Sequence, residues 1–136
     1  IVNNYAYPGE SNVHILMRLL DQISLNGYPH MVVIGWTSEQ RMAWFNGKTI
    51  EAKGGWHLPF QIKVIDKNKE QFAGYNKLLV DTVRELCRGR TKLYEWTVFD
   101  NNIGLPKIPL EDQSADGVHP GPKTIQRIAR LIEHEI

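Results

Sequence analysis

The sequence lacks the features of several protein classes. Its 136 residues contain one cysteine, Cys87, so no disulfide can form within the chain and no oxidising compartment is required. No apolar run approaches the length of a membrane span, and no signal peptide is visible. The formal net charge of +1 gives no electrostatic footprint for nucleic acid or an anionic membrane. We expect neither of these partners.

Motifs for metal ions and phosphates are missing as well. His14, His30, His57 and His134 form no close pair with the spacing of metal ligands, and the single cysteine adds none. No glycine-rich phosphate loop occurs. The sequence therefore predicts no metal site and no cofactor.

The chain does have the composition of one ordinary globular domain covering residues 1–136, with 42% hydrophobic and 23% charged residues. Apolar spacing predicts strands at 1–6, 30–35 and 92–99, and helices at 12–26, 70–88 and from about 120–122 onwards. A short polar helix or turn is expected at 39–44, and an irregular excursion with room for a hairpin at 46–69. This alternation predicts an α/β fold, a three-layer α/β/α sandwich with a mainly parallel sheet.

Helical spacing also predicts which residues are buried. On the second helix they are Tyr75, Leu78, Leu79, Thr82, Val83 and Leu86. On the last helix they are Ile125, Ile128, Ala129 and Ile132. Cys87 falls within the second helix, where a buried thiol is inert as a nucleophile.

Candidate site residues gather after the predicted strands, because ligands of open α/β sheets bind beyond the carboxyl ends of the strands. Asp116 and His119 are three residues apart in a loop before the last helix. That spacing allows the carboxylate to orient the imidazole while the other ring nitrogen faces a nucleophile. The alternative is a turn-forming Asp beside a helix-capping His. Gly9, after the first strand, can present its N–H to an oxyanion or can be a plain turn.

Three segments resemble the sequence blocks of SGNH hydrolases, also called the GDSL family. Residues 116–120, Asp-Gly-Val-His-Pro, are similar to the family's C-terminal DxxHP block. Residues 4–12 resemble its glycine block, and residues 33–41 occupy the place of its GxND block. The sequences of these last two segments are most similar to those of SGNH-like proteins encoded by tailed bacteriophages. The blocks come in the family's order and span nearly the whole chain.

The resemblance implies a role for each matching residue. His119 would be the general base that activates a serine, Asp116 would orient it, and the Gly9 amide would donate to the oxyanion. The third block contributes Gly35, but the family's asparagine falls on Thr37, whose hydroxyl has a shorter reach than a carboxamide. Oxyanion stabilisation would then be weaker, or Asn12 would contribute instead.

A larger departure is the absence of the GDS(L) block that carries the family's nucleophile. Ser11, Ser24, Ser38 and Ser114 are the serines present, and none follows the matching block. In this fold the first strand lies between the strands expected at 1–6 and 30–35. Without it, two buried strand edges would lack partners. The resemblance therefore predicts roughly 20 to 50 further residues upstream, enough for a strand and its loops. The domain would be N-terminally incomplete.

The resemblance implies a serine esterase that hydrolyses an ester without a cofactor, with O-acetyl groups on a carbohydrate as the expected substrate. Trp36 and Trp56 are candidate substrate contacts, although Trp36 beside a buried strand also fits the core. One alternative is a non-catalytic SGNH-like module of a phage particle that binds glycan or protein. Another is an unrelated flavodoxin-like binding domain. The location is left open, with a phage virion and the host cytoplasm as candidates, and so is the oligomeric state.

Overall fold

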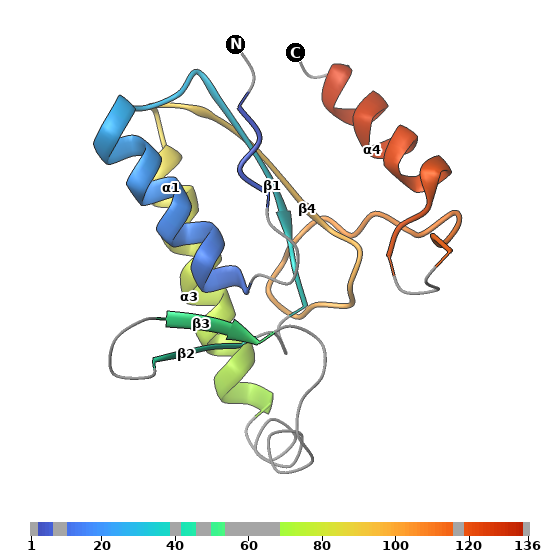
Figure 1. Ribbon diagram of the computed structural model, residues 1–136, viewed down its shortest axis with the longest axis horizontal. Coiled ribbons are helices and arrows are strands. Elements are labelled where there is room, and N and C mark those ends of the chain that lie inside the picture. The colour runs from blue at the N-terminus through green and yellow to red at the C-terminus, as the bar shows by residue number, and fades with distance from the viewer. Residues whose placement is uncertain are drawn as a thin grey trace.

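The computed structural model describes residues 3–6, 11–38, 42–45, 50–53, 69–115 and 119–134 (Figure 1). The helices are α1 (Asn12–Asn26), α3 (Lys69–Cys87) and α4 (Pro122–Glu133). The strands are β1 (Met31–Trp36), β2 (Met42–Phe45), β3 (Ile50–Lys53) and β4 (Lys92–Thr97). These elements make a small mixed α/β protein, which confirms the predicted class. The predicted three-layer sandwich goes beyond what they form.

The helix predicted at 12–26 is confirmed as α1. Leu16, Leu19 and Ile23 recur at helical spacing and pack toward the core. The helix ends where expected, at Gly27, whose φ of 76° lies in the region that favours glycine. Gly27 donates its N–H to the Ile23 carbonyl at 2.9 Å and so satisfies one of the last carbonyls of the helix.

The sheet of β1 and β4 is parallel, as the alternation of helices and strands predicts. Met31 lies opposite Lys92 and Trp36 opposite Thr97. Val32, Ile34 and Trp36 point to the face that α1 and α3 cover, whereas Val33 on the opposite face is 42% exposed. One face of this sheet is therefore packed, and the other is partly open.

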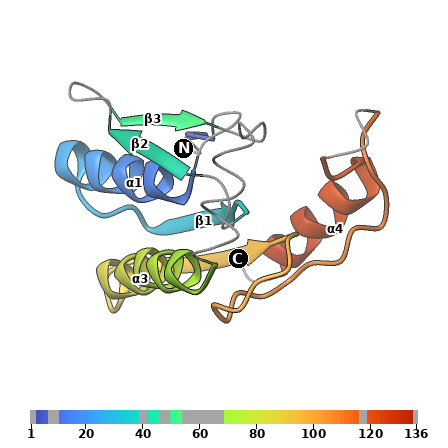
Figure 2. The same cartoon turned by 90° about the horizontal axis from the view of Figure 1, so that it is seen from below.

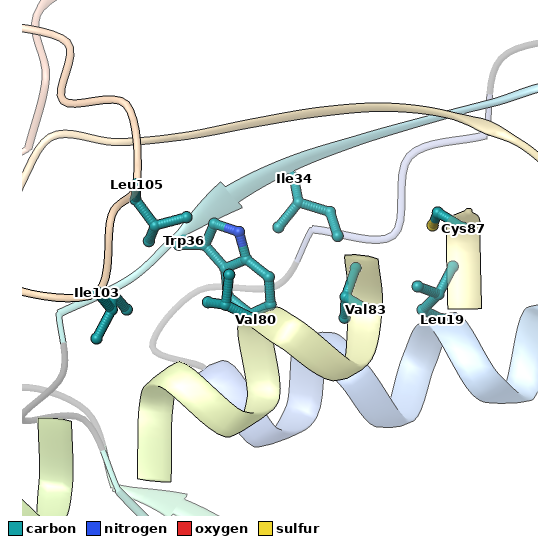
Figure 3. Packing of buried hydrophobic residues seen from close by; sticks show 8 residues of the cluster. All are labelled: Leu19, Ile34, Trp36, Val80, Val83, Cys87, Ile103 and Leu105. Carbon is teal, nitrogen blue, oxygen red and sulfur yellow. The ribbon is translucent and has the colours of Figure 1, made fainter. Parts of the chain in front are cut away.

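The core lies between the sheet, α1 and α3 (Figure 3). Trp36 is 2% exposed, and its indole lies beside Val80 and near Ile103 and Leu105 (Figure 3). Cys87 closes the other end of the core beside Leu19. Burial, and secondly the negative charge of Glu95, raise the pKa of the Cys87 thiol. The thiol therefore stays protonated near neutral pH, as expected of an inert core cysteine.

The buried side of α3 differs from the prediction. Leu79 and Val83 are buried as expected, together with Val80, Asn76 and Cys87. Tyr75 and Leu78, predicted to be buried, are 49% and 63% exposed. Helical spacing is satisfied by two neighbouring apolar stripes on α3, and the helix turns only one of them toward the sheet.

The short helix or turn expected at 39–44 is wrong for its described part, because residues 42–44 belong to β2, which forms an antiparallel hairpin with β3. Met42 pairs with Lys53, and Phe45 pairs with Ile50. The hairpin expected in the excursion is therefore present, but its first strand begins earlier than predicted. Apolar residues 42–45 suit a strand, and the Asn46-Gly47 sequence between the strands is typical of hairpin connections.

The strand predicted at 1–6 is wrong for the residues that the structure describes there. Residues 3–6 form no strand and are exposed. The Ala6 N–H donates to the Asn4 side chain at 3.0 Å, a local bond of the kind that asparagine makes in turns. Strand propensity alone does not make a ladder, because the backbone needs a neighbouring strand to pair with.

Helix α4 lies on the opposite side of the two-stranded sheet from α1 and α3 (Figure 2). Ile128 is buried as predicted, but Ile125 is 56% exposed and Ala129 is also exposed. Its first turn is hydrogen-bonded to Asp112 in the loop before it. The centre of its apolar stripe is therefore covered, and one flank is open to solvent.

Candidate functional site

A buried polar junction lies at the carboxyl end of β1. The side chain of Asn12, the first residue of α1, is 1% exposed. Its Oδ1 accepts the Thr37 N–H at 2.9 Å, and its Nδ2 donates to the Thr37 carbonyl at 3.2 Å. Nδ2 also donates to Oδ1 of Asn76 on α3 at 2.8 Å. One carboxamide thus joins α1, α3 and the residue that follows β1.

These bonds change the role expected of Asn12. A carboxamide has two N–H groups to donate, and Asn12 donates both within the protein. Neither is left for an oxyanion, so Asn12 positions the backbone instead of contributing there. The hydroxyl of Thr37, like the indole N–H groups of Trp36 and Trp96, is buried and finds no hydrogen-bond partner among the described residues. These are polar groups near this strand end that have a hydrogen bond still to make.

Gly35, which belongs with Thr37 to the segment that resembles the GxND block, lies against an aromatic ring. A Cβ added at Gly35 would lie 2.7 Å from Cζ2 of Trp96, closer than real Cβ atoms come to other atoms. The ring crosses from β4 over the open face of the sheet at this point. Trp36 points the other way, into the core, which supports the alternative of a core residue over the expected substrate contact.

His119 is exposed in the loop that enters α4. Its carbonyl accepts the Ser114 N–H at 2.9 Å, and the next residue, Pro120, forms an isolated bridge with Gln113. The two arms of the loop are therefore paired around residues 116–118. Asp116, the proposed partner of His119, lies outside the described residues, as do Gly9 and Trp56.

Asp112, which was not among the residues predicted from the sequence, connects the start of this loop to the first turn of α4. Oδ1 and Oδ2 of Asp112 accept N–H groups from the first turn of α4, those of Thr124 and Lys123. Desolvation would raise the pKa of the Asp112 carboxyl, but these hydrogen bonds and the charge of Lys123 hold it below its ordinary value. Asp112 follows Glu111 in a polar loop, and no local spacing connects it to Thr124.

The structure brings together two of the three predicted segments. Thr37 after β1 meets Asn12, which is the first residue of α1 and the last residue of the segment that resembles the glycine block. Ile103 and Leu105, early in the loop between β4 and α4, pack with Trp36 beside this junction. The part of the loop that leads into α4 lies apart from the start of α1 in both views (Figures 1 and 2). Asn76 is a second missed residue, because an asparagine within a helix carries no local signal of its partner.

Ser11, at the start of α1, is 1% exposed, and its hydroxyl lies 3.0 Å from Nδ1 of His14. A serine beside an imidazole has the composition of a nucleophile and base, but Ser11 does not follow the block that carries the family's nucleophile. The Ser11 side chain makes no capping bond to the helix backbone, so its hydroxyl pairs with His14 on the first turn of α1 instead.

Comparisons with protein-family models, with curated proteins and with solved structures find no match to this chain. Along the described part of the chain, no helix has both the length and the apolar character needed to cross a bilayer. The same residues contain no group of His, Cys, Asp and Glu side chains arranged to hold a metal ion.

Proposed function

We propose that this chain is the greater part of a serine esterase domain of the SGNH type, with His119 as general base and Asp116 as its orienting carboxylate. The observation that carries the proposal is the junction of Asn12 and Thr37. It joins two of the three family-like segments, which are remote in sequence, at the carboxyl end of a parallel strand. Ligands of α/β proteins bind at such strand ends.

In this proposal the nucleophilic serine belongs to a GDS block upstream of residue 1. The serine oxygen bonds to the ester carbonyl carbon, its proton passes to His119 and then to the leaving alcohol, and the acyl group stays on the serine. Water, deprotonated by His119, then attacks the acyl-serine, and the acid is released as the proton returns to the serine. The backbone N–H of Gly9 and the buried hydroxyl of Thr37 stabilise the oxyanion. No cofactor takes part. An O-acetyl group on a carbohydrate is the proposed substrate, with Trp56 as a contact for the sugar ring.

The complete domain that we propose is a three-layer α/β/α sandwich with a mainly parallel sheet. Helices α1 and α3 on one side of the sheet and α4 on the other are consistent with it (Figure 2). Catalysis also requires the loop before α4 to close toward the Thr37 junction. Val33 on the open face and Ile125 and Leu131 on α4 are 42%, 56% and 48% exposed. Burying such side chains would favour closure.

The test is hydrolysis of p-nitrophenyl acetate by the full-length protein. His119→Ala should lower kcat by a factor on the order of 10³ or more, because the serine loses its base. His134→Ala is the matched control, since His134 is exposed at the other end of α4. It should hydrolyse the ester at the unaltered rate. Equal rates for the wild type and His119→Ala would exclude the catalytic role.

A non-catalytic SGNH-like module that binds glycan or protein is the second candidate. The Thr37 position, where the family has asparagine, favours it. A full-length protein that binds acetylated glycan but does not hydrolyse it would support this function.

A further inference from the structure

The start of α4 lacks a capping side chain of its own. Gly121 precedes the helix, and a glycine has no side chain to accept the first N–H groups. Asp112, from the loop before the helix, supplies the acceptors. Its Oδ1 accepts the Thr124 N–H at 2.9 Å, and its Oδ2 accepts the Lys123 N–H at 3.1 Å. A negative charge at a helix N-terminus is also favoured by the helix dipole.

Thr124 completes the connection from the helix side. Its side chain is 0% exposed, and its hydroxyl oxygen accepts the N–H groups of Glu111 at 2.9 Å and Asp112 at 3.2 Å. The hydroxyl hydrogen can point to Oδ1 of Asp112 at 3.0 Å or to its carbonyl at 3.2 Å. The Thr124 hydroxyl thus serves both as acceptor and as donor to hold residues 111–112 against the helix.

Packing at Gly121 indicates how closely the carboxylate approaches. A Cβ at this position would lie 2.5 Å from Cγ of Asp112 and 2.8 Å from the carbonyl oxygen of Gln113. The φ of Gly121 is −81°, so any residue could adopt its backbone conformation. Glycine is required here by space, because Asp112 occupies the place of a side chain.

From Asp112 the connection continues along the loop to His119. The Gly121 N–H donates to the Asp112 carbonyl at 3.0 Å, Gln113 forms a bridge with Pro120, and the Ser114 N–H donates to the His119 carbonyl at 2.9 Å. These contacts form a short ladder whose base is the carboxylate and whose far step is His119. A change at the base therefore reaches the backbone of His119 through adjacent bonded pairs.

We infer that Asp112 is a positioning residue, which fixes the first turn of α4 and, through the ladder, the backbone that carries His119. The catalytic consequence rests on the proposed function, whereas the structural part stands without it. Asp112 touches no substrate in this proposal, and its effect on the reaction passes through His119.

The experiment compares the full-length wild type with Asp112→Ala, Asp112→Asn and Glu111→Gln. Amide hydrogen exchange at Ser114 and Gly121 reports the ladder, and amides of β1 and β4 report the core. Asp112→Ala should speed exchange at Ser114 and Gly121 roughly 5- to 30-fold, the effect of a lost cap, without changing the sheet. Asp112→Asn keeps one acceptor oxygen, so the exchange rates of this variant should fall between those of the wild type and those of Asp112→Ala.

Glu111→Gln is the matched control. Glu111 is the adjacent residue, and its side chain makes a surface ion pair with Arg127 at 2.9 Å. Such pairs contribute little to stability, so exchange should stay at wild-type rates. In p-nitrophenyl acetate hydrolysis, Asp112→Ala should lower kcat about tenfold and leave KM nearly unchanged, because a displaced base weakens the chemical step rather than substrate binding.

Unchanged exchange in both Asp112 variants would overturn the inference, whatever the activity. Faster exchange with an unchanged kcat, in an enzyme that His119→Ala inactivates, would also overturn it, since the loop would then not position the base. A wild type that does not hydrolyse the ester would count against the proposed function alone. The exchange rates would still decide whether Asp112 fixes the loop.

Discussion

Asn12 holds Thr37 by both of its backbone groups, with its Oδ1 2.9 Å from the Thr37 nitrogen and its Nδ2 3.2 Å from the Thr37 oxygen. A carboxamide offers the same donor and acceptor as a peptide group, so it pairs with Thr37 as a neighbouring strand would. The path of the chain beyond β1 is therefore set by a side chain from α1, not by the sheet.

Replacement of Asn12 should destabilise the protein. Asn12→Ala leaves the Thr37 N–H and C=O without this partner in a partly buried place, and it deprives Oδ1 of Asn76 of a buried donor. A buried group without its hydrogen bond costs about 1–3 kcal/mol, so we expect the free energy of unfolding to fall by at least about 2 kcal/mol. Urea denaturation followed by circular dichroism measures this change.

Asn26→Ala is the control for that measurement. Asn26 ends the same helix, is exposed, and makes a side-chain hydrogen bond with Gln22 at the surface. Its replacement should change the free energy of unfolding by less than about 0.5 kcal/mol. Similar midpoints for Asn12→Ala and Asn26→Ala would show that the junction contributes nothing to stability.

The sequence predicted elements whose signals are local. Helix α1 has apolar residues at helical spacing and a glycine at its end, and β1 is a short apolar run, so both were predicted close to their observed bounds. The sequence predicts a helix or turn at 39–44 although residues 42–44 form a strand, because hairpin pairing is a tertiary property. The apolar stripe with Leu78 could not be distinguished from the buried one, since spacing alone does not show which stripe faces the sheet.

The candidate site was predicted less completely, for a physical reason. Asn12, Gly35 and Thr37 were found because they follow strand-like segments. Their roles depend on Asn76 and Trp96, which approach from α3 and β4 and have no spacing relation to them. Asp112 is a similar case, because its partners belong to a helix that begins ten residues later. Long-range polar contacts of this kind leave no periodic signal in a sequence.

Gly35 and Trp96 provide the second prediction. Gly35→Ala would place a methyl group 2.7 Å from Cζ2 of Trp96, so the indole must move. We expect the free energy of unfolding to fall by about 1–3 kcal/mol, the usual cost of overpacking. Replacement of the indole in Gly35→Ala/Trp96→Leu should remove most of the added cost, which a double-mutant cycle measures in urea.

Gly74→Ala is the matched control, because a Cβ at Gly74 on α3 would meet no atom within 4 Å. Alanine favours a helix over glycine, so this variant should be more stable than the wild type by about 0.5–1 kcal/mol. Opposite signs at the two glycines would support a steric reason for Gly35. A stabilising Gly35→Ala would contradict the contact with Trp96.

The carboxylate of Asp112 provides the last prediction, a dependence of stability on pH. Its pKa is lower in the folded protein than its ordinary value of about 3.8, because Thr124 and Lys123 donate hydrogen bonds to it and the charge of Lys123 adds to their effect. A carboxyl whose pKa falls on folding stabilises the folded state above its unfolded pKa, and this contribution is lost as pH falls through the folded pKa. The nearby Glu111 is paired with Arg127 and is present in both proteins compared. The difference in urea midpoint between the wild type and Asp112→Asn should therefore be constant from pH 7 to about pH 5 and should shrink below about pH 4. A difference that grows in acid would mean that the charged form of Asp112 is not the one that holds α4.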